Sequence, residues 1–129
     1  MSLSGFAGTR PPREEVLLLG LIDWVPLERV HQAVVDAYPA RPLREIQEAT
    51  VELVSGLARE GLFAIGDLTG ENSRFVPWPI TQEQSVQRIR DAYVDNFDDA
   101  DHWSWFCWLD LTERGATIAQ PIEDRLRRS

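Results

Sequence analysis

Apolar residues recur at helical spacing in three successive segments of the N-terminal half of the chain. Because they repeat every three or four positions, we predict helices over residues 12–23, 27–38 and 43–60. The first segment is apolar nearly all round, which places its helix at the centre of the fold. The third has the clearest stripe, made by Leu43, Ile46, Thr50, Leu53 and Leu57.

The segments that follow have the pattern of extended chain. Residues 62–68 predict a strand, and residues 74–79 are extended because their two prolines are incompatible with a helix or a central strand. Residues 103–111 alternate as a strand does, with Trp, Trp, Cys, Leu and Leu on one face. The opposite face carries Phe106 and Trp108, so we expect this strand to need a cover on each side.

Two more helices are predicted from their caps. Thr81 and Gln84 form a capping box that opens a helix over about residues 82–96. Thr112 caps a last helix, which Pro121 is expected to kink or divide. We therefore predict an α+β domain that is mostly helical.

Two local motifs resemble those of a known family. Residues 57–62, LAREGL, resemble the junction at which the recognition helix of MarR- and PadR-type repressors meets the first strand of the wing. Residues 111–115, LTERG, resemble the junction at which the second wing strand enters the next helix. The resemblance implies a winged-helix domain with a two- to three-stranded antiparallel sheet. Its wing would be enlarged by residues 69–103, which include an inserted helix. The length of 129 residues predicts one domain over residues 1–129, and the small, polar residues 1–10 predict a loose leader.

The same resemblance implies a DNA-binding transcriptional regulator, with residues 43–60 as the recognition helix. Its candidate DNA contacts are Arg44, Gln47 and Arg74. However, residues 43–60 carry two arginines against four glutamates, and the Asp-x-Arg pair of the MarR wing is replaced by Asp-His-Trp at residues 101–103. Helices that enter a major groove usually present basic or amide side chains to phosphates and bases. These departures make nucleic acid a disfavoured partner.

The charge of the chain also disfavours nucleic acid. Its 129 residues include 13 Lys and Arg against 21 Asp and Glu, a net charge of −8, so that polyphosphate is repelled. Between Asp91 and Asp110, both included, there are six aspartates and no Lys or Arg. No segment has the roughly 20 apolar residues that span a bilayer, and acidic residues precede the first apolar run. We therefore expect a cytoplasmic protein without a membrane partner.

Candidates for catalysis and metal binding are few. Cys107 is the single cysteine, so neither an internal disulfide nor a cysteine-based metal site is expected. A nucleophile–base pair of Cys107 with His31 or His102 is disfavoured, because the thiol falls on an apolar strand face where it is buried and inert. The aspartates around His102 lack the calcium-loop pattern. We predict no catalytic residue, no metal and no cofactor, and hence no enzyme.

Aromatic residues of the C-terminal half are the least ordinary feature of the chain: Phe75, Trp78, Trp103, Trp105, Phe106 and Trp108. They form either a core for the insertion or an interface, because Trp is enriched in binding hot spots. The predicted interaction surface combines aromatic and acidic residues: Trp78, Trp103, Phe106, Trp108, Asp98, Asp99 and Asp101. Our leading hypothesis is a non-catalytic module that binds a protein partner or itself, as a homodimer. The alternative is the DNA-binding regulator.

Overall fold

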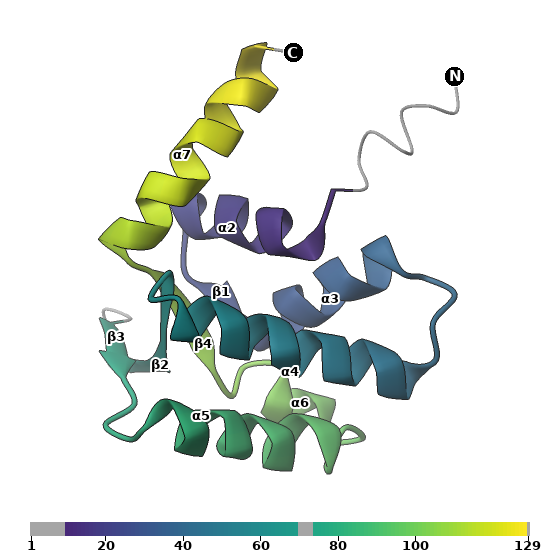
Figure 1. Ribbon diagram of the computed structural model, residues 1–129. Coiled ribbons are helices and arrows are strands. Elements are labelled where there is room, and N and C mark those ends of the chain that lie inside the picture. Colours follow the sequence, from purple (N-terminus) through teal and green to yellow (C-terminus); the bar gives the residue numbers. More distant parts are fainter. Residues whose placement is uncertain (1–9, 70–73, 129) are drawn as a thin grey trace.

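A computed structural model of the chain describes residues 10–69 and 74–128 (Figure 1). The predicted leader therefore lies almost wholly outside the described residues, as do residues 70–73 of the predicted insertion. The N-terminal half forms three helices and a short strand: α2 (Pro12–Ile22), β1 (Val25–Pro26), α3 (Leu27–Ala37) and α4 (Leu43–Arg59). The three helices confirm the segments predicted from helical spacing, to within one residue at each end.

A four-stranded antiparallel sheet connects the two halves of the chain. Its other strands are β2 (Phe63–Thr69), β3 (Arg74–Pro77) and β4 (Trp108–Leu111), and the spatial order is β1-β4-β2-β3. Leu109 of β4 lies opposite Val25 on one side and Ile65 on the other, and Gly66 lies opposite Pro77. The α+β class is confirmed. The sheet is larger than the predicted two or three strands, because β1 and β3 each add an edge.

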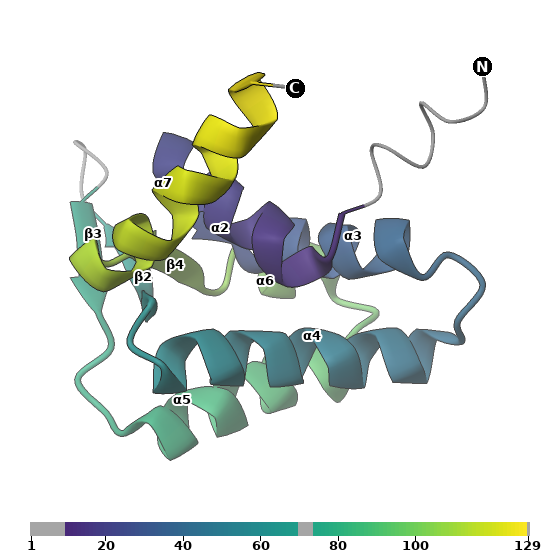
Figure 2. The same ribbon diagram turned by 45° about the horizontal axis from the view of Figure 1, so that its top comes forward.

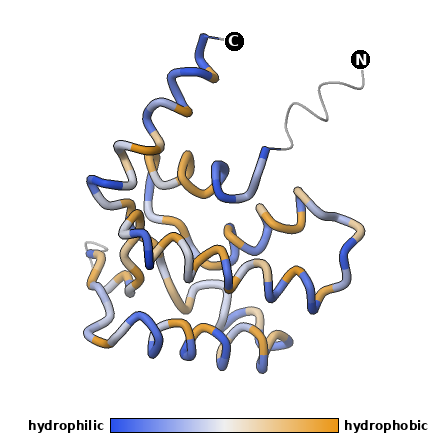
Figure 3. Tube along the Cα trace, in the orientation of Figure 1, coloured by the Kyte–Doolittle hydropathy of each residue, from blue (hydrophilic) through white to orange (hydrophobic). Residues whose placement is uncertain are grey.

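One face of the sheet packs against the helices. Val25, Leu109 and Phe63 are buried there against residues of α2, α3 and α4. The last helix, α7 (Glu113–Arg128), packs across α2 (Figure 1). Apolar and polar residues alternate along α4 in Figure 3, as expected for a helix with one buried face.

The chain between β3 and β4 forms a second layer beside α4. It contains α5 (Gln82–Ile89), a π-helical turn η1 (Arg90–Val94) and the short helix α6 (Ala100–Trp103). Figure 2 shows α5 running along α4. The predicted capping box is confirmed: the backbone N–H of Gln84 donates to the Thr81 hydroxyl over 3.1 Å, and the N–H of Thr81 donates to Oε1 of Gln84 over 3.0 Å.

The predicted strand over residues 103–111 is only half correct. Strand β4 begins at Trp108, and Trp103 instead ends helix α6. The cause is tertiary, because the Trp103 indole N–H donates to the carbonyl of Phe97 over 2.7 Å and the two rings stack with centroids 4.9 Å apart. This packing outweighs the strand preference of the aromatic residues. Pro121 does not divide the last helix, since α7 continues through it from Glu113 to Arg128.

Candidate functional site

A groove lined by three tryptophans lies where the end of α2, strand β1 and the first turn of α3 meet the residues before β4. Its volume is about 500 Å³. We call it the tryptophan groove, and it is lined by Leu19, Ile22, Asp23, Trp24, Val25, Pro26, Glu28, Arg29, Trp105 and Trp108. Trp105 is 57% exposed and Ile22 is 79% exposed. Large apolar side chains gathered in one exposed hollow are typical of a binding surface.

The sheet register explains why Trp108 reaches this groove. Successive residues of a strand point to opposite faces, and Leu109 is fully buried on the face that meets the helices. Trp108 therefore points to the opposite face, where it lies level with Pro26 of β1 and Gly66 of β2. Its ring stacks on that of Trp105, with centroids 5.8 Å apart and planes at 29°. The two indoles form one flat apolar wall.

The rim of the groove carries charges of both signs. Asp23, Glu28 and Arg29 line it, and none of the three forms an ion pair with another residue that the structure describes. Asp23 accepts a hydrogen bond from the backbone N–H of Trp24 over 2.7 Å. Glu28 and Arg29 are neighbours in the first turn of α3. Their charges are therefore available to a partner.

The structure does not place every predicted interaction residue on a surface. Trp78 and Trp103 are only 6% and 4% exposed, so their predicted exposure is wrong. The guanidinium of Arg88 lies over Trp78, 4.1 Å from the ring centroid, and Trp103 stacks on Phe97. These two tryptophans are packed in the core of the insertion, whereas Trp108 lines the groove.

The remaining residues of the predicted surface lie elsewhere. Phe106 is half-buried and packs edge-on against Trp78, with ring centroids 5.4 Å apart. Asp98 and Asp99 are exposed and line a separate hollow beside Phe97 and the start of α4. Asp101 is exposed in α6. The aspartates and the exposed tryptophans thus do not line a common hollow.

The predicted interaction surface shares only Trp108 with the groove, and it omits the large apolar residues Ile22, Trp24 and Trp105. Ile22 and Trp24 stand at the end of a predicted helix, where periodicity does not assign a face. Trp105 was assigned to the same strand face as Cys107, and only the turn at residues 104–107 brings it to the surface. A tryptophan directly after a helix end was the one available signal.

The predicted DNA contacts do not converge. Gln47 is 6% exposed and its amide donates to the carbonyl of Tyr93 over 3.5 Å. The prediction that Gln47 contacts DNA is therefore wrong. Arg44 and Arg74 are exposed. Arg44 lies in the first turn of α4, however, whereas Arg74 begins β3, which lies toward the other end of that helix (Figure 1). No single groove of DNA faces all three.

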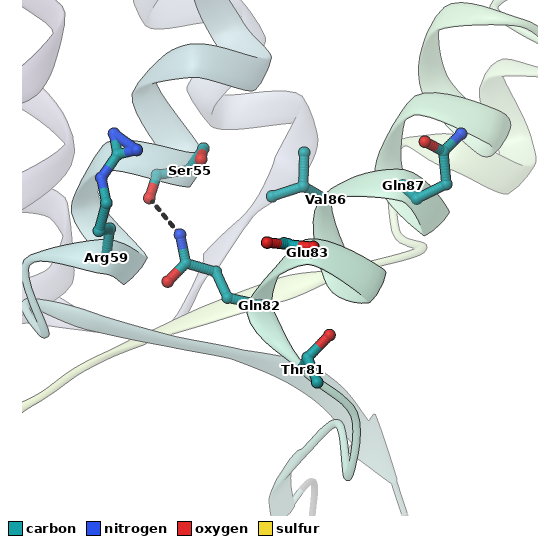
Figure 4. A pocket seen from close by; sticks show the side chains of 7 residues that line it. All are labelled: Ser55, Arg59, Thr81, Gln82, Glu83, Val86 and Gln87. Carbon is teal, nitrogen blue, oxygen red and sulfur yellow. Dashed lines mark hydrogen bonds between the residues drawn. The ribbon is translucent and has the colours of Figure 1, made fainter.

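Polar contacts hold α5 and η1 against α4. Both guanidinium Nη atoms of Arg90 donate to the carboxylate of Glu48, over 3.0 and 3.1 Å, and this hydrogen bonding lowers the pKa of Glu48. The side-chain amide of Gln82 donates to the carbonyl of Ser55 over 3.0 Å (Figure 4). The helix that the resemblance assigns to DNA reading is therefore partly covered by the chain's own insertion.

The hollow drawn in Figure 4 lies beside these contacts. It has a volume of about 620 Å³ and a largely polar lining: Ser55, Arg59, Thr81, Gln82, Glu83, Val86 and Gln87. Its lining includes neither a cysteine nor a histidine. The hydroxyl of Thr81 and the amide of Gln82 are already engaged in hydrogen bonds within the chain.

The residues considered for catalysis differ in exposure: Cys107 is buried, His31 is half-buried and His102 is exposed. Cys107 is 0% exposed, and burial raises its pKa to about 12, so the thiol stays neutral at ordinary pH. Nδ1 of His31 lies 2.5 Å from the hydroxyl of Tyr93, and burial lowers the pKa of His31. Burial also raises the pKa of Tyr93 to about 12. Cys107 and Tyr93 belong to the hydrophobic core, and His31 packs against Tyr93.

Metal ions and membranes are two further classes of possible partner. Within residues 10–69 and 74–128, no group of three or more His, Cys, Asp or Glu side chains is arranged to hold a metal ion. Among the helices of the same residues, none has the length and apolarity needed to cross a bilayer.

Comparisons of the chain with protein-family models, curated proteins and solved structures found no match.

Proposed function

We propose that the protein is a non-catalytic, cytoplasmic protein-interaction module and that the tryptophan groove is its contact surface. The observation that carries this proposal is the exposure of Trp105 and Ile22 beside Trp108 in one hollow. Apolar surface removed from water stabilises a complex by roughly 25 cal/mol per Å², and Trp is among the commonest hot-spot residues.

The environment of the reactive side chains supports a role without catalysis. A catalytic thiol or imidazole needs access to substrate and a pKa suited to proton transfer near neutral pH. Cys107 has neither, and His31 lies among the rings of Tyr93, Phe97 and Trp103. The exposed groove offers apolar and charged contacts in their place.

Site-specific crosslinking tests the proposal. A photoreactive phenylalanine analogue replaces Trp105 in the cells that make the protein, and the matched control carries it at Glu83, an exposed residue of the polar hollow. Irradiation is expected to give a protein–protein adduct from position 105 and none from position 83. Absence of an adduct at 105, or equal adducts at both positions, would count against the groove.

DNA binding is the second candidate function, and one observation favours it. Three helices precede β2, and after the insertion β4 leads into α7, which is the order of elements on which the winged-helix resemblance rests. Two observations oppose DNA binding: α5 covers part of α4, and the chain has a net charge of −8. Fluorescence anisotropy with mixed-sequence duplex DNA at low salt is expected to show no binding. If binding is seen, falls steeply with salt and is weakened by Arg44→Ala together with Arg74→Ala, DNA binding becomes the leading candidate function.

A further inference from the structure

The tryptophan groove combines an apolar wall with neighbouring charges of opposite sign. Glu28 and Arg29 are adjacent in the first turn of α3, and both line the groove that Trp105 leaves open. Neither charge is neutralised by an ion pair within the described chain. A partner that fits this surface therefore offers apolar area together with charged groups of both signs.

We propose that the occupant of the groove is a second copy of this chain, related to the first by a two-fold axis. The inference rests on the proposed function of the groove as a contact surface. In a two-fold contact the same patch meets itself, so each interaction occurs twice. An axis beside the first turn of α3 brings Arg29 of each copy opposite Glu28 of the other.

Charge is the reason for choosing a second copy over a strongly basic partner. A basic partner would satisfy Glu28 and Asp23 but would meet Arg29 with a like charge, and like charges facing each other disfavour a wrong partner. The two-fold contact pairs both signs. It also buries the stacked rings of Trp105 and Trp108 against those of the other copy, and offset aromatic stacking is favourable.

The size of the groove sets the expected strength. Ten residues line it, whereas stable interfaces use about 20–30 residues on each side. The net charge of −8 on each copy further opposes association at low salt. We therefore expect a dimer with a dissociation constant in the micromolar range, on the order of 10 μM.

Sedimentation equilibrium of the full chain over a wide concentration range tests the dimer. Trp105→Gln is expected to weaken association at least about tenfold while leaving the circular dichroism spectrum unchanged, because the side chain is 57% exposed. Glu28→Arg and Arg29→Glu are each expected to weaken it by a similar factor. The double variant, which exchanges the two charges, is expected to recover most of the lost affinity.

Arg74→Glu is the matched control for Arg29→Glu. It makes the same change of net charge at an exposed residue of β3, which lies at the opposite edge of the sheet from β1. The control is expected to dimerise nearly as the parent chain does. Equal weakening by Arg74→Glu and Arg29→Glu would show a general charge effect and overturn the proposed pairing.

The other outcomes separate this inference from the proposed function. A chain that stays monomeric at every concentration, while position 105 crosslinks a different protein, overturns the dimer and keeps the groove as a contact surface. A dimer unaffected by Trp105→Gln places self-association elsewhere and overturns the inference. Failure of the double variant to recover affinity overturns the two-fold pairing of Glu28 with Arg29. A monomer without any adduct at 105 overturns both proposals.

Discussion

The hydroxyl of Thr112 donates a hydrogen bond to the backbone carbonyl of Gly61 over 2.6 Å. The same oxygen accepts a bond from the N–H of Gly115 over 3.0 Å, which caps α7. Gly61 itself has a φ of 75°, the left-handed conformation that ends α4 and favours glycine. One threonine side chain therefore joins the end of α4 to the start of α7, the two junctions recognised in the sequence.

Thr112→Val tests this connection. Valine has nearly the shape of threonine without its hydroxyl, so the variant loses the cap and leaves the carbonyl of Gly61 with one partner fewer. We expect a loss of about 1–2 kcal/mol in the free energy of unfolding, measured by urea denaturation. Thr112→Ser keeps the hydroxyl and is the control. A loss in Thr112→Ser without a loss in Thr112→Val would show that the methyl group, and not the hydrogen bonds, matters.

The glycines of α4 and α7 are predicted to respond in opposite directions to alanine. A Cβ on Gly115 would lie 2.2 Å from the backbone carbonyl oxygen of Leu62, too close for any side-chain adjustment to relieve. Gly115→Ala is therefore expected to destabilise the protein by about 3 kcal/mol or more. On Gly56, within α4, the nearest atom would be the terminal nitrogen of Arg59 at 3.9 Å.

Gly56→Ala is accordingly the matched substitution at an open position. It is expected to stabilise the protein by up to about 1 kcal/mol, because alanine favours the helix more than glycine does. Thermal or urea unfolding of both variants checks the pair. Tolerance of Gly115→Ala would mean that α7 and the turn after α4 are not in the described contact.

Trp103 and Trp105 are predicted to differ sharply although they are two positions apart. Trp103 is 4% exposed, and its removal by Trp103→Ala leaves a cavity and an unpaired carbonyl at Phe97. We expect a cost of about 3–5 kcal/mol. Trp105→Ala removes a side chain that is 57% exposed and is expected to cost less than about 1 kcal/mol. Urea denaturation of dilute samples of both variants checks the difference; equal costs would contradict the assignment of one tryptophan to the core and one to the groove.

Local patterns were sufficient for most of the helices but not for the aromatic segment. The helix over residues 43–60 was predictable because apolar residues recur on one face along its whole length. Gly61 ends it where a residue in the left-handed conformation is needed. Residues 103–107 also alternate, yet they form the end of α6 and a turn. Their conformation depends on Trp103 stacking with Phe97, a contact that no short-range pattern contains.

The groove was harder to predict for a related reason. It brings Trp24, which follows α2, together with Trp105, which precedes β4, across 81 positions of sequence. That meeting requires β1 to pair with β4, and a two-residue strand gives almost no signal of its own. The unusual density of tryptophans was visible in the sequence, whereas their division between core and surface was set by tertiary packing.

The half-buried side chain of His31 makes the stability of the protein depend on pH. Nδ1 of His31 lies 2.5 Å from the Tyr93 hydroxyl, and the ring contacts Phe97 and Trp103 as well. Burial lowers the pKa of His31 below its ordinary 6.5, so the folded chain binds this proton less readily than the unfolded chain. Stability must then rise with pH wherever the unfolded chain binds more protons.

The free energy of unfolding is therefore expected to be nearly level above about pH 7 and to fall as pH decreases through 6.5. Glu48 acts at lower pH, because its lowered pKa leaves its contribution intact until pH falls below about its ordinary 4.5. Urea denaturation between about pH 5 and 8 measures the slope, and His31→Gln, which cannot titrate, is expected to reduce it. An unchanged slope in this variant would assign the effect to another group, and stability that increases on acidification would show that the pKa of His31 is raised.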